Sequence, residues 1–304
     1  MSGIINSGSF NKALWPGVNA WYGAAYDEWA VEHTDLFDQY TSRKGFEEDV
    51  GISGTGLLMI KPEGQAIQYD TMVQGYITRY THIEYALGMV ITKIIVEDDQ
   101  YDIVGPKRAK ALAFSTRQTP ENVAANVYNR AFNSAYTGGD GKEMIATDHP
   151  NVAGGTWSNE LSVAANVSEA ALEQAVIDIA RFKNDKGLPI QVTPRSIITA
   201  PENMFELERI LKSQYRVGTP NNDINALMSM GKFPEGVKIN HYLSSTTAWF
   251  IRTNAPDGLK HFVRSPVKFA EDNDFDTSNA KFKVEYRDSF GWTDPRGIYG
   301  SAGV

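Results

Sequence analysis

Cysteine is absent from the 304 residues of the chain, which excludes disulfide bonds, thiolate metal sites and thiol catalysis. Histidine is scarce as well. The five histidines, His33, His82, His149, His241 and His261, never stand at the spacing of zinc ligands, and no His-Glu-x-x-His motif occurs. We therefore expect stability to come from packing alone, and we expect no metal site and no cofactor.

Long hydrophobic runs are also missing, because no stretch reaches the roughly 18 apolar residues of a membrane-spanning helix. The first residues lack the basic start and the apolar run of a secretion signal. With 37 acidic against 29 basic residues, the formal charge of −8 disfavours a surface that grips phosphate backbones as its main activity. The sequence predicts a soluble cytoplasmic protein with no membrane partner.

Catalytic motifs are few. The stretch GISGTG has its glycines in the wrong order for a phosphate loop, and no Gly-x-Ser-x-Gly elbow supplies a nucleophile. Alternating Asp272, Asp274 and Asp276 lack the glycine and the glutamate of a calcium loop. A carboxylate beside an imidazole can fix its tautomer, so Asp148 and His149 leave a soluble hydrolase open as a remote alternative. Because adjacent loop residues rarely face each other, we expect no catalytic residues.

Residues 1–45 mix glycine, serine and asparagine with widely spaced aromatic residues and show little sustained periodicity. Trp15, Trp21, Tyr22 and Trp29 can each cover a large area at low conformational cost. In a segment of low structural propensity, they indicate an arm that contacts another molecule. The alternative is a strap that folds on the core of its own chain.

The sequence becomes β-like from 49 to 85, with strand-forming runs on both sides of a turn. Lys-Pro-Glu-Gly at 61–64 suits a type I turn, because proline presets φ at the second position and glycine is favoured at the fourth. Arms of about ten residues reach about 33 Å, beyond the roughly 19 Å radius of gyration of a compact chain of this length. We expect a projecting hairpin covered by another molecule, with a hairpin inside a local sheet as the alternative.

The stretch 95–135 carries apolar residues mostly at three- and four-residue steps, which indicates one buried helical stripe. Pro106 and Pro120 interrupt it. A single helix over 99–135 would be roughly 55 Å long and could serve as the spine of a broad, flat molecule. Two ordinary helices are the alternative, because proline suits the first turn of a new helix.

The glycine-rich stretch 136–162 predicts a long loop or short ribbon, after which a second α+β unit begins. Ser168 is placed to cap a helix. The strand RSIITA, a second helix over 201–212, the loop RVGTPNNDINAL and the strand-like runs VKINHYL and AWFIR then give two helices against a small sheet. Over 252–304, strand-like alternation returns in KFKVEY.

Taken in order, several runs resemble the major capsid protein of tailed bacteriophages: RYTHIEYALGMVITKIIVEDDQYD, AANVYNRAFNSA, DGKEMIATDHP, GGTWSNELS, SEAALEQAVIDI, TPNNDINAL and DNDFDTSNAKFKVEYRDSFGWTDPRGIYGS. The chain is similar to the Mu-like major head subunit group, which has the Hong Kong 97 capsid fold. The resemblance covers about residues 45–300 and rests on the order and texture of these runs rather than on a catalytic signature.

The resemblance implies an α+β fold with four parts. We expect an N-terminal arm at 1–45 and an extended loop, a β-hairpin, at 46–80. The resemblance places a peripheral domain with the spine helix at 81–155 and 252–304, and an axial domain at 156–251.

The resemblance also implies a function in assembly. Such a protein forms hexamers and pentamers that close an icosahedral shell around double-stranded DNA, so we expect it in the virion capsid after assembly in the bacterial host cytoplasm. Implied partners are copies of itself, a portal, a scaffold and decoration or cement proteins, with weak non-specific contact to packaged DNA. Some members begin with a cleavable scaffolding segment; since this chain starts with methionine and enters the arm at once, we expect a separate scaffold protein.

The candidates for contact between subunits follow from the arm, the hairpin tip and the loop of the axial domain. They are Trp15, Trp21, Trp29, Lys61, Pro62, Glu63, Gly64, Asn221, Asn222 and Asp223. The main alternative to a phage head is an encapsulin-type nanocompartment shell of the same fold. A monomeric module that binds a peptide along the hairpin edge is a further alternative from another class.

Overall fold

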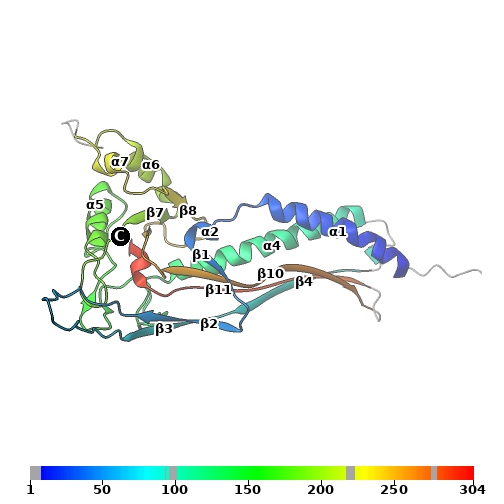
Figure 1. The fold of residues 1–304 in the computed structure, drawn as a ribbon. Coiled ribbons are helices and arrows are strands. Elements are labelled where there is room, and N and C mark those ends of the chain that lie inside the picture. The colour runs from blue at the N-terminus through cyan, green and yellow to red at the C-terminus, as the bar shows by residue number, and fades with distance from the viewer. Residues whose placement is uncertain (1–7, 93, 96–100, 217–222, 275–278) are drawn as a thin grey trace, which may run out of the picture.

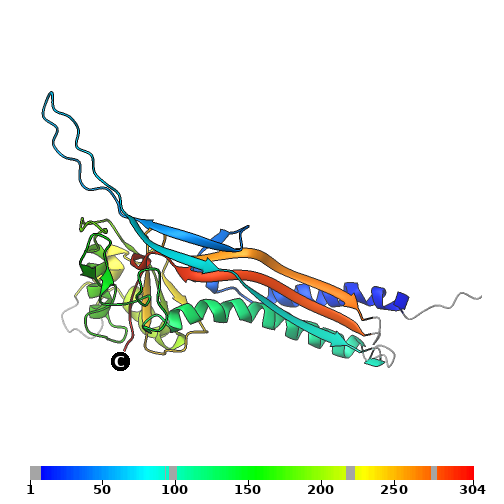
Figure 2. The same cartoon turned by 90° about the horizontal axis from the view of Figure 1, so that it is seen from below.

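The computed structural model describes residues 8–92, 94–95, 101–216, 223–274 and 279–304. Two regions meet at an angle (Figure 1). One is a long limb that we call the long-sheet region, and the other is a shorter upright part that we call the small-sheet region. A loop projects from near their junction (Figure 2). The fold is mixed α+β, as the sequence predicts.

A four-stranded, mostly antiparallel sheet forms the base of the long-sheet region. Its strands are β1 (Asp38–Thr41), β4 (Ile83–Ile91), β10 (Leu259–Asn273) and β11 (Ala280–Trp292). Their order is β1-β10-β11-β4, with β1 parallel to β10 and the other pairs antiparallel. Along β11, Phe282 and Val284 are buried in a core cluster while Lys281 and Lys283 are exposed. The period of two therefore separates a helix-covered face from an open face.

The spine is one continuous helix, α4 (Tyr101–Asn129), so the two-helix alternative is wrong. Its 29 residues span about 44 Å. Both prolines lie inside it. Around Pro120, the hydroxyls of Thr116 and Thr119 donate to carbonyl oxygens one turn back, at 2.7 Å each. The helix ends six residues before the expected position 135, at Asn129.

The N-terminal segment is more regular than its sequence predicts. It forms α1 (Gly8–Glu28), then the short α2 (His33–Leu36) and strand β1. On α1, Val18, Tyr22 and Ala25 recur at helical spacing and are buried in the same cluster as Leu112 of α4. This packing outweighs the low helical propensity of the local glycine and asparagine residues, which is why local propensity does not predict the helix. Within the single chain, the segment behaves as a strap on its own core.

The small-sheet region has helices packed on a second four-stranded sheet. Its elements are α5 (Glu169–Ala180), β7 (Pro194–Thr199), the 3₁₀ turn η1 (Pro201–Asn203), α6 (Met204–Lys212), α7 (Ala226–Met230), β8 (Val237–Ile239), β9 (Trp249–Thr253), the 3₁₀ turn η2 (Pro295–Gly297) and β12 (Ile298–Ser301). The strand order is β12-β9-β7-β8. Ser168 caps α5 by accepting a hydrogen bond from the Ala171 amide, as predicted.

The end of the chain returns to this second sheet. β12 pairs with β9, and β9 itself runs across the expected boundary between residues 251 and 252. The sheet therefore includes a strand from the 252–304 segment that the sequence assigns elsewhere. Pairing across such a distance leaves no local signal, and the four-part division of the chain stays a prediction.

A two-stranded ribbon leads into the projecting loop. It consists of β2 (Phe46–Ile52) and β3 (Gln74–Thr81), which pair antiparallel with a bulge near Gly51. There the backbones approach closely, because a Cβ added to Gly75 would lie 2.9 Å from the Gly51 carbonyl oxygen. A second ribbon, β5 (His149–Pro150) with β6 (Thr156–Trp157), lies in the stretch expected to be a loop or short ribbon, which confirms that prediction.

Candidate assembly surfaces

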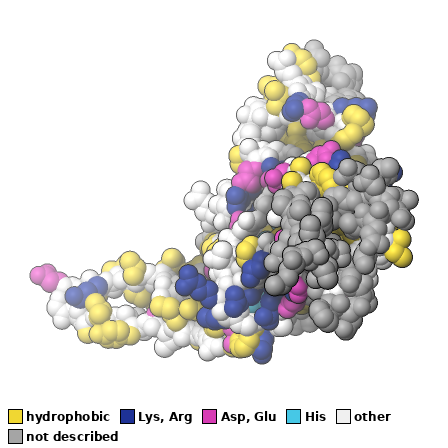
Figure 3. All heavy atoms as spheres, turned by 90° about the vertical axis from the view of Figure 1, so that its right-hand side faces the viewer, with side chains coloured by type: hydrophobic (Ala, Val, Ile, Leu, Met, Phe, Trp, Pro, Cys, Tyr) yellow, Lys and Arg dark blue, Asp and Glu magenta, His cyan; other side chains and the backbone are white. Residues whose placement is uncertain are grey.

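The projecting loop, residues 53–73, carries large apolar side chains in solvent. Leu57, Leu58, Met59 and Ile60 are exposed by 77, 100, 71 and 95%. Further exposed apolar residues on the loop are Ile67, Tyr69, Met72 and Val73. Figure 3 shows hydrophobic side chains along the projection at its left. Contiguous exposed apolar surface of this kind marks a site of protein contact.

The backbone of the loop is also largely unpaired. At its base, the Ser53 amide donates to the Val73 carbonyl oxygen at 3.0 Å, and at its tip the Gln65 amide donates to the Pro62 carbonyl oxygen at 3.2 Å. Among the hydrogen bonds of the described residues, none involves the backbone of 57–61. An extended segment with free amides and carbonyls is a ready partner for another strand.

The tip turn differs from the predicted one by a residue. Its hydrogen bond spans Pro62 to Gln65, so Glu63 and Gly64 are the central residues instead of Pro62 and Glu63. Gly64 has φ of +79°, which suits the third position of a type II turn and requires glycine. The predicted type I turn over 61–64 is therefore wrong, because the conformational freedom of glycine sets the turn rather than the fixed φ of proline.

A carboxylate holds the base of the loop. Asp70 accepts hydrogen bonds from the Gly56 amide at 2.6 Å, from the Thr71 amide at 2.8 Å and from Lys186 Nζ at 2.6 Å. The Gly56 amide, followed by Lys186, lowers the pKa of Asp70 to about 2. Since Lys186 follows α5, this contact, which we call the base latch, ties both arms of the loop to the small-sheet region.

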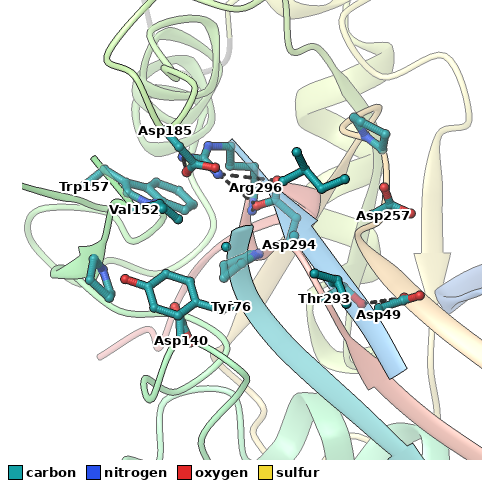
Figure 4. Close-up of a pocket in the computed structure, with 17 residues that line it drawn as sticks. Asp49, Tyr76, Asp140, Val152, Trp157, Asp185, Asp257, Thr293, Asp294 and Arg296 are labelled. Carbon is teal, nitrogen blue, oxygen red and sulfur yellow. Dashed lines mark hydrogen bonds and ion pairs between the residues drawn. The ribbon is translucent and has the colours of Figure 1, made fainter. Parts of the chain in front are cut away.

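A hollow of about 260 Å³ lies behind the ribbon, between β2, β3 and the two regions (Figure 4). On one side, Arg296 pairs with Asp185 at 2.9 Å and Asp294 at 3.3 Å, and its guanidinium lies 4.5 Å from the Trp157 ring centroid. Burial raises the pKa of Asp294. Arg296 thus joins two carboxylates and an aromatic ring, as residues of structural networks do.

On the other side of the hollow, a buried lysine anchors the ribbon. Lys260 Nζ contacts Asp49 Oδ2 at 2.5 Å and Asp257 Oδ1 at 2.7 Å. Asp49 also accepts a hydrogen bond from Thr293 at 2.9 Å. The direction in which the loop leaves the molecule is therefore fixed by β2 at this anchor and by the base latch.

The dyad considered for hydrolysis is not formed. His149 is fully buried, with Nδ1 2.7 Å from Asp140 Oδ2 and Nε2 3.1 Å from Asn159 Oδ1. Asp148 instead pairs with Lys142 at 2.5 Å. The hypothesis of a hydrolase using Asp148 and His149 is therefore wrong: the imidazole belongs to the core, and its orienting carboxylate is nine residues earlier in the chain.

A family model described as phage capsid protein matches residues 75–301, about three quarters of the chain. The chain belongs to the phage capsid protein family. It is thus a structural protein of a capsid shell and not an enzyme. A search of curated proteins found no match.

Solved structures show the same fold as this capsid protein. A procapsid protein of bacteriophage JBD30 is 13% identical with a TM-score of 0.53, covering 96% of this chain and 75% of that chain. A protein of Microbacterium phage Oxtober96 is 9% identical with a TM-score of 0.52, covering 91% and 92%. A virus-like particle from Pyrococcus furiosus is 9% identical with a TM-score of 0.50, covering 93% and 97%. The capsid fold predicted from the sequence is confirmed.

The contact candidates of this capsid protein lie in several places. Trp15 is on α1, but its side chain is outside the described part. Trp21 packs partly on the chain's own core, whereas Trp29 is 47% exposed with its ring 4.7 Å from that of Phe114. Lys61, Pro62, Glu63 and Gly64 are exposed at the loop tip. Asn221 and Asn222 lie outside the described residues, and Asp223 is exposed beside them in sequence.

Sequence reasoning chose the loop tip and missed the apolar run before it. Four consecutive apolar residues beside a turn were the available signal, because both faces of such a strand need cover. No local sequence pattern indicates the base latch, because Asp70 and Lys186 are 116 positions apart. A second exposed apolar group, near the end of the small-sheet region, was also missed; it comprises Met204, Phe205, Ile224, Met228 and Met230.

Other kinds of site were sought in the part of the chain that the structure describes. No group of three or more histidine, aspartate or glutamate side chains there could hold a metal ion. None of the described helices has the length and apolarity needed to cross a membrane.

Proposed function

We propose that this capsid protein is the major head subunit of a tailed bacteriophage. In this proposal its copies form hexamers and pentamers, which close an icosahedral shell around a double-stranded DNA genome. The observation that carries the proposal is the projecting loop, whose eight exposed apolar residues and unpaired backbone are incomplete in a single chain. Membership of the capsid family supplies the kind of partner, a second copy.

The energetics favour a shell built from many modest contacts. Burying one exposed leucine or isoleucine contributes roughly 1.5–3 kcal/mol, so the loop alone can supply a contact of useful strength before ordering costs are subtracted. Several such contacts per subunit add avidity, and each remains weak enough to dissociate and correct errors. The net charge of −8 fits a container that contacts packaged DNA weakly.

Shortening the loop tests the proposal. Gly56 and Asp70 are bonded across the base, so residues 57–69 can be replaced by two glycines without removing the base latch. We expect a folded subunit with unchanged circular dichroism that forms no closed particles in electron micrographs. A Val163→Ser variant, changed at an exposed site off the loop, is the control and should assemble. Normal particles from the shortened chain would contradict the proposal.

A second candidate is an encapsulin-type shell, which holds enzymes instead of a genome. A virus-like particle from Pyrococcus furiosus shares the fold, so the fold does not separate the two candidates. Particles isolated from the native source separate the two, since a phage head contains long double-stranded DNA and a nanocompartment contains protein cargo. The ratio of absorbance at 260 and 280 nm, followed by nuclease digestion and mass spectrometry, gives the answer.

A phage head also requires other proteins as partners of its major subunit. A portal, a separate scaffold and decoration or cement proteins would join the shell, which assembles in the host cytoplasm and persists in the virion. Co-expression with the neighbouring genes of the source genome tests this, because a scaffold should raise the yield of uniform particles. Uniform particles from the capsid protein alone would show that no scaffold is needed.

A further inference from the structure

The outer edge of β4 is an open strand edge. β4 is the last strand of the long sheet, and no described strand pairs with its free side. Arg108 donates to the Val90 carbonyl oxygen at 2.7 Å, which shows that this group points away from β11. Because such groups alternate along an antiparallel strand, Gly88, Ala86 and Glu84 also direct their amides and carbonyls outward.

β4 is the longest edge strand of the two four-stranded sheets. It has nine residues, whereas β1 and β12 have four each and β8 has three. From Tyr85 to Ile91 it carries no charge, although natural edge strands are commonly protected by charged residues or proline. A long, uncharged edge is one that a protein leaves open when a partner strand is to cover it.

An apolar groove runs beside this edge. It has a volume of about 210 Å³, lies between β4 and α4, and is lined by Tyr85, Ala86, Leu87, Ser115, Thr116, Thr119, Val284 and Tyr286. Leu87 is 53% exposed although it pairs with buried Val284 of β11. The helices therefore leave the rim of the sheet uncovered, and side chains as well as backbone are available to a partner.

We infer that residues 57–60 of one copy add as a fifth strand to the β4 edge of a second copy. The inference rests on the proposed function and names the receptor for the loop. Residues 57–60 have an extended backbone without hydrogen-bond partners and carry no charge. On its free side, the part of β4 from Tyr85 to Met89 likewise has no described partner strand, and it carries no charge. The loop cannot reach β4 of its own chain, because it points away from that strand (Figure 2).

Charge complementarity selects an antiparallel register. With Leu58 opposite Leu87, the uncharged run 57–60 faces uncharged residues throughout. Lys61, the next residue, then falls opposite Glu84, the charged residue that precedes the uncharged part of β4. Opposite charges at directly facing positions stabilise a strand pair, and Leu58 would enter the groove beside Leu87.

Engineered disulfides test the pairing, and the absence of cysteine removes any background. We would scan cysteines at 57–60 against cysteines at 85–88, with Leu58→Cys and Leu87→Cys as the expected best pair. Mild oxidation of assembled particles should give covalent oligomers on non-reducing gels. Leu58→Cys with Val163→Cys is the control, because Val163 is 74% exposed and lies away from β4.

The outcomes separate the inference from the proposed function. Covalent oligomers from any β4 position of the scan support edge pairing, and the best pair fixes the register. Particles that form normally but link only to the control position, or to none, overturn the inference and leave the proposed function standing. If the parent chain forms no particles at all, the proposed function itself fails.

A charge exchange gives an independent readout. Lys61→Glu should lower the particle yield several-fold because it places two carboxylates opposite each other, and Glu84→Lys should do the same with two ammonium groups. The double variant should restore the yield. A double variant no better than either single one would contradict the register.

Discussion

Replacing Leu58 by serine should weaken assembly without weakening the subunit. Leu58 is fully exposed in the single chain, so its side chain contributes nothing to the subunit's own core. If a second copy buries it, serine removes about 2 kcal/mol from that contact. This corresponds to about a 30-fold weaker contact, since each 1.4 kcal/mol is a factor of ten.

The assay is the concentration at which particles first appear, followed by light scattering or sedimentation. For Leu58→Ser we expect this critical concentration to rise about 30-fold if each subunit makes one such contact. The free energy of unfolding of the subunit should stay within about 0.5 kcal/mol of the parent. Val163→Ser, at a similarly exposed site off the loop, should change neither quantity. An unchanged critical concentration for Leu58→Ser, or a loss of subunit stability, would refute the reasoning.

Three further predictions concern the parts that position the loop. An NMR titration should give Asp70 a pKa of about 2, below its ordinary value. The base latch should therefore be fully formed at any pH above the ordinary pKa and be lost as the pH falls through about 2. Lys186→Met should raise the pKa of Asp70. Lys260→Met should destabilise the subunit by about 1–3 kcal/mol and speed hydrogen exchange in β2, because Asp49 loses its cation; unchanged exchange would count against the anchor. His149→Ala should cost about 3 kcal/mol in thermal unfolding, since a buried ring and two hydrogen bonds are lost, and an unchanged Tm would contradict the core assignment.

Elements with strong local patterns could be predicted from the sequence. The alternation of KFKVEY identifies a strand with one buried face. Ser168 marks the start of a helix, because the amide that its hydroxyl accepts from is only three positions later in the sequence. Strand-forming runs on both sides of a turn predicted a projection, but the paired strands end at Ile52 and begin again at Gln74, so the runs beside the turn form no strand pair. In each case, residues close in sequence determine the outcome.

Features that depend on distant contacts could not be predicted. α1 forms because Val18 and Tyr22 meet α4, which overrides weak local propensity. β12 joins β9 from the far end of the chain. His149 finds its carboxylate in Asp140 rather than in its neighbour Asp148, because chain direction in the loop decides which side chains face each other.

The surfaces between copies are harder still, since no single-chain pattern states what will cover them. The run at 57–60 has the pattern of a strand in the sequence, whereas in the structure it belongs to no strand and no described part of the chain covers it. The edge of β4 likewise looked like an ordinary strand in the sequence. Only the strand order shows that one side of it is open.

Electron microscopy of the purified protein across a range of concentrations tests the central claim most directly. The account predicts closed particles of uniform diameter with icosahedral symmetry, in which the loop of each subunit lies on a neighbour. Monomers that stay compact at every concentration, with the loop folded against its own chain, would contradict it.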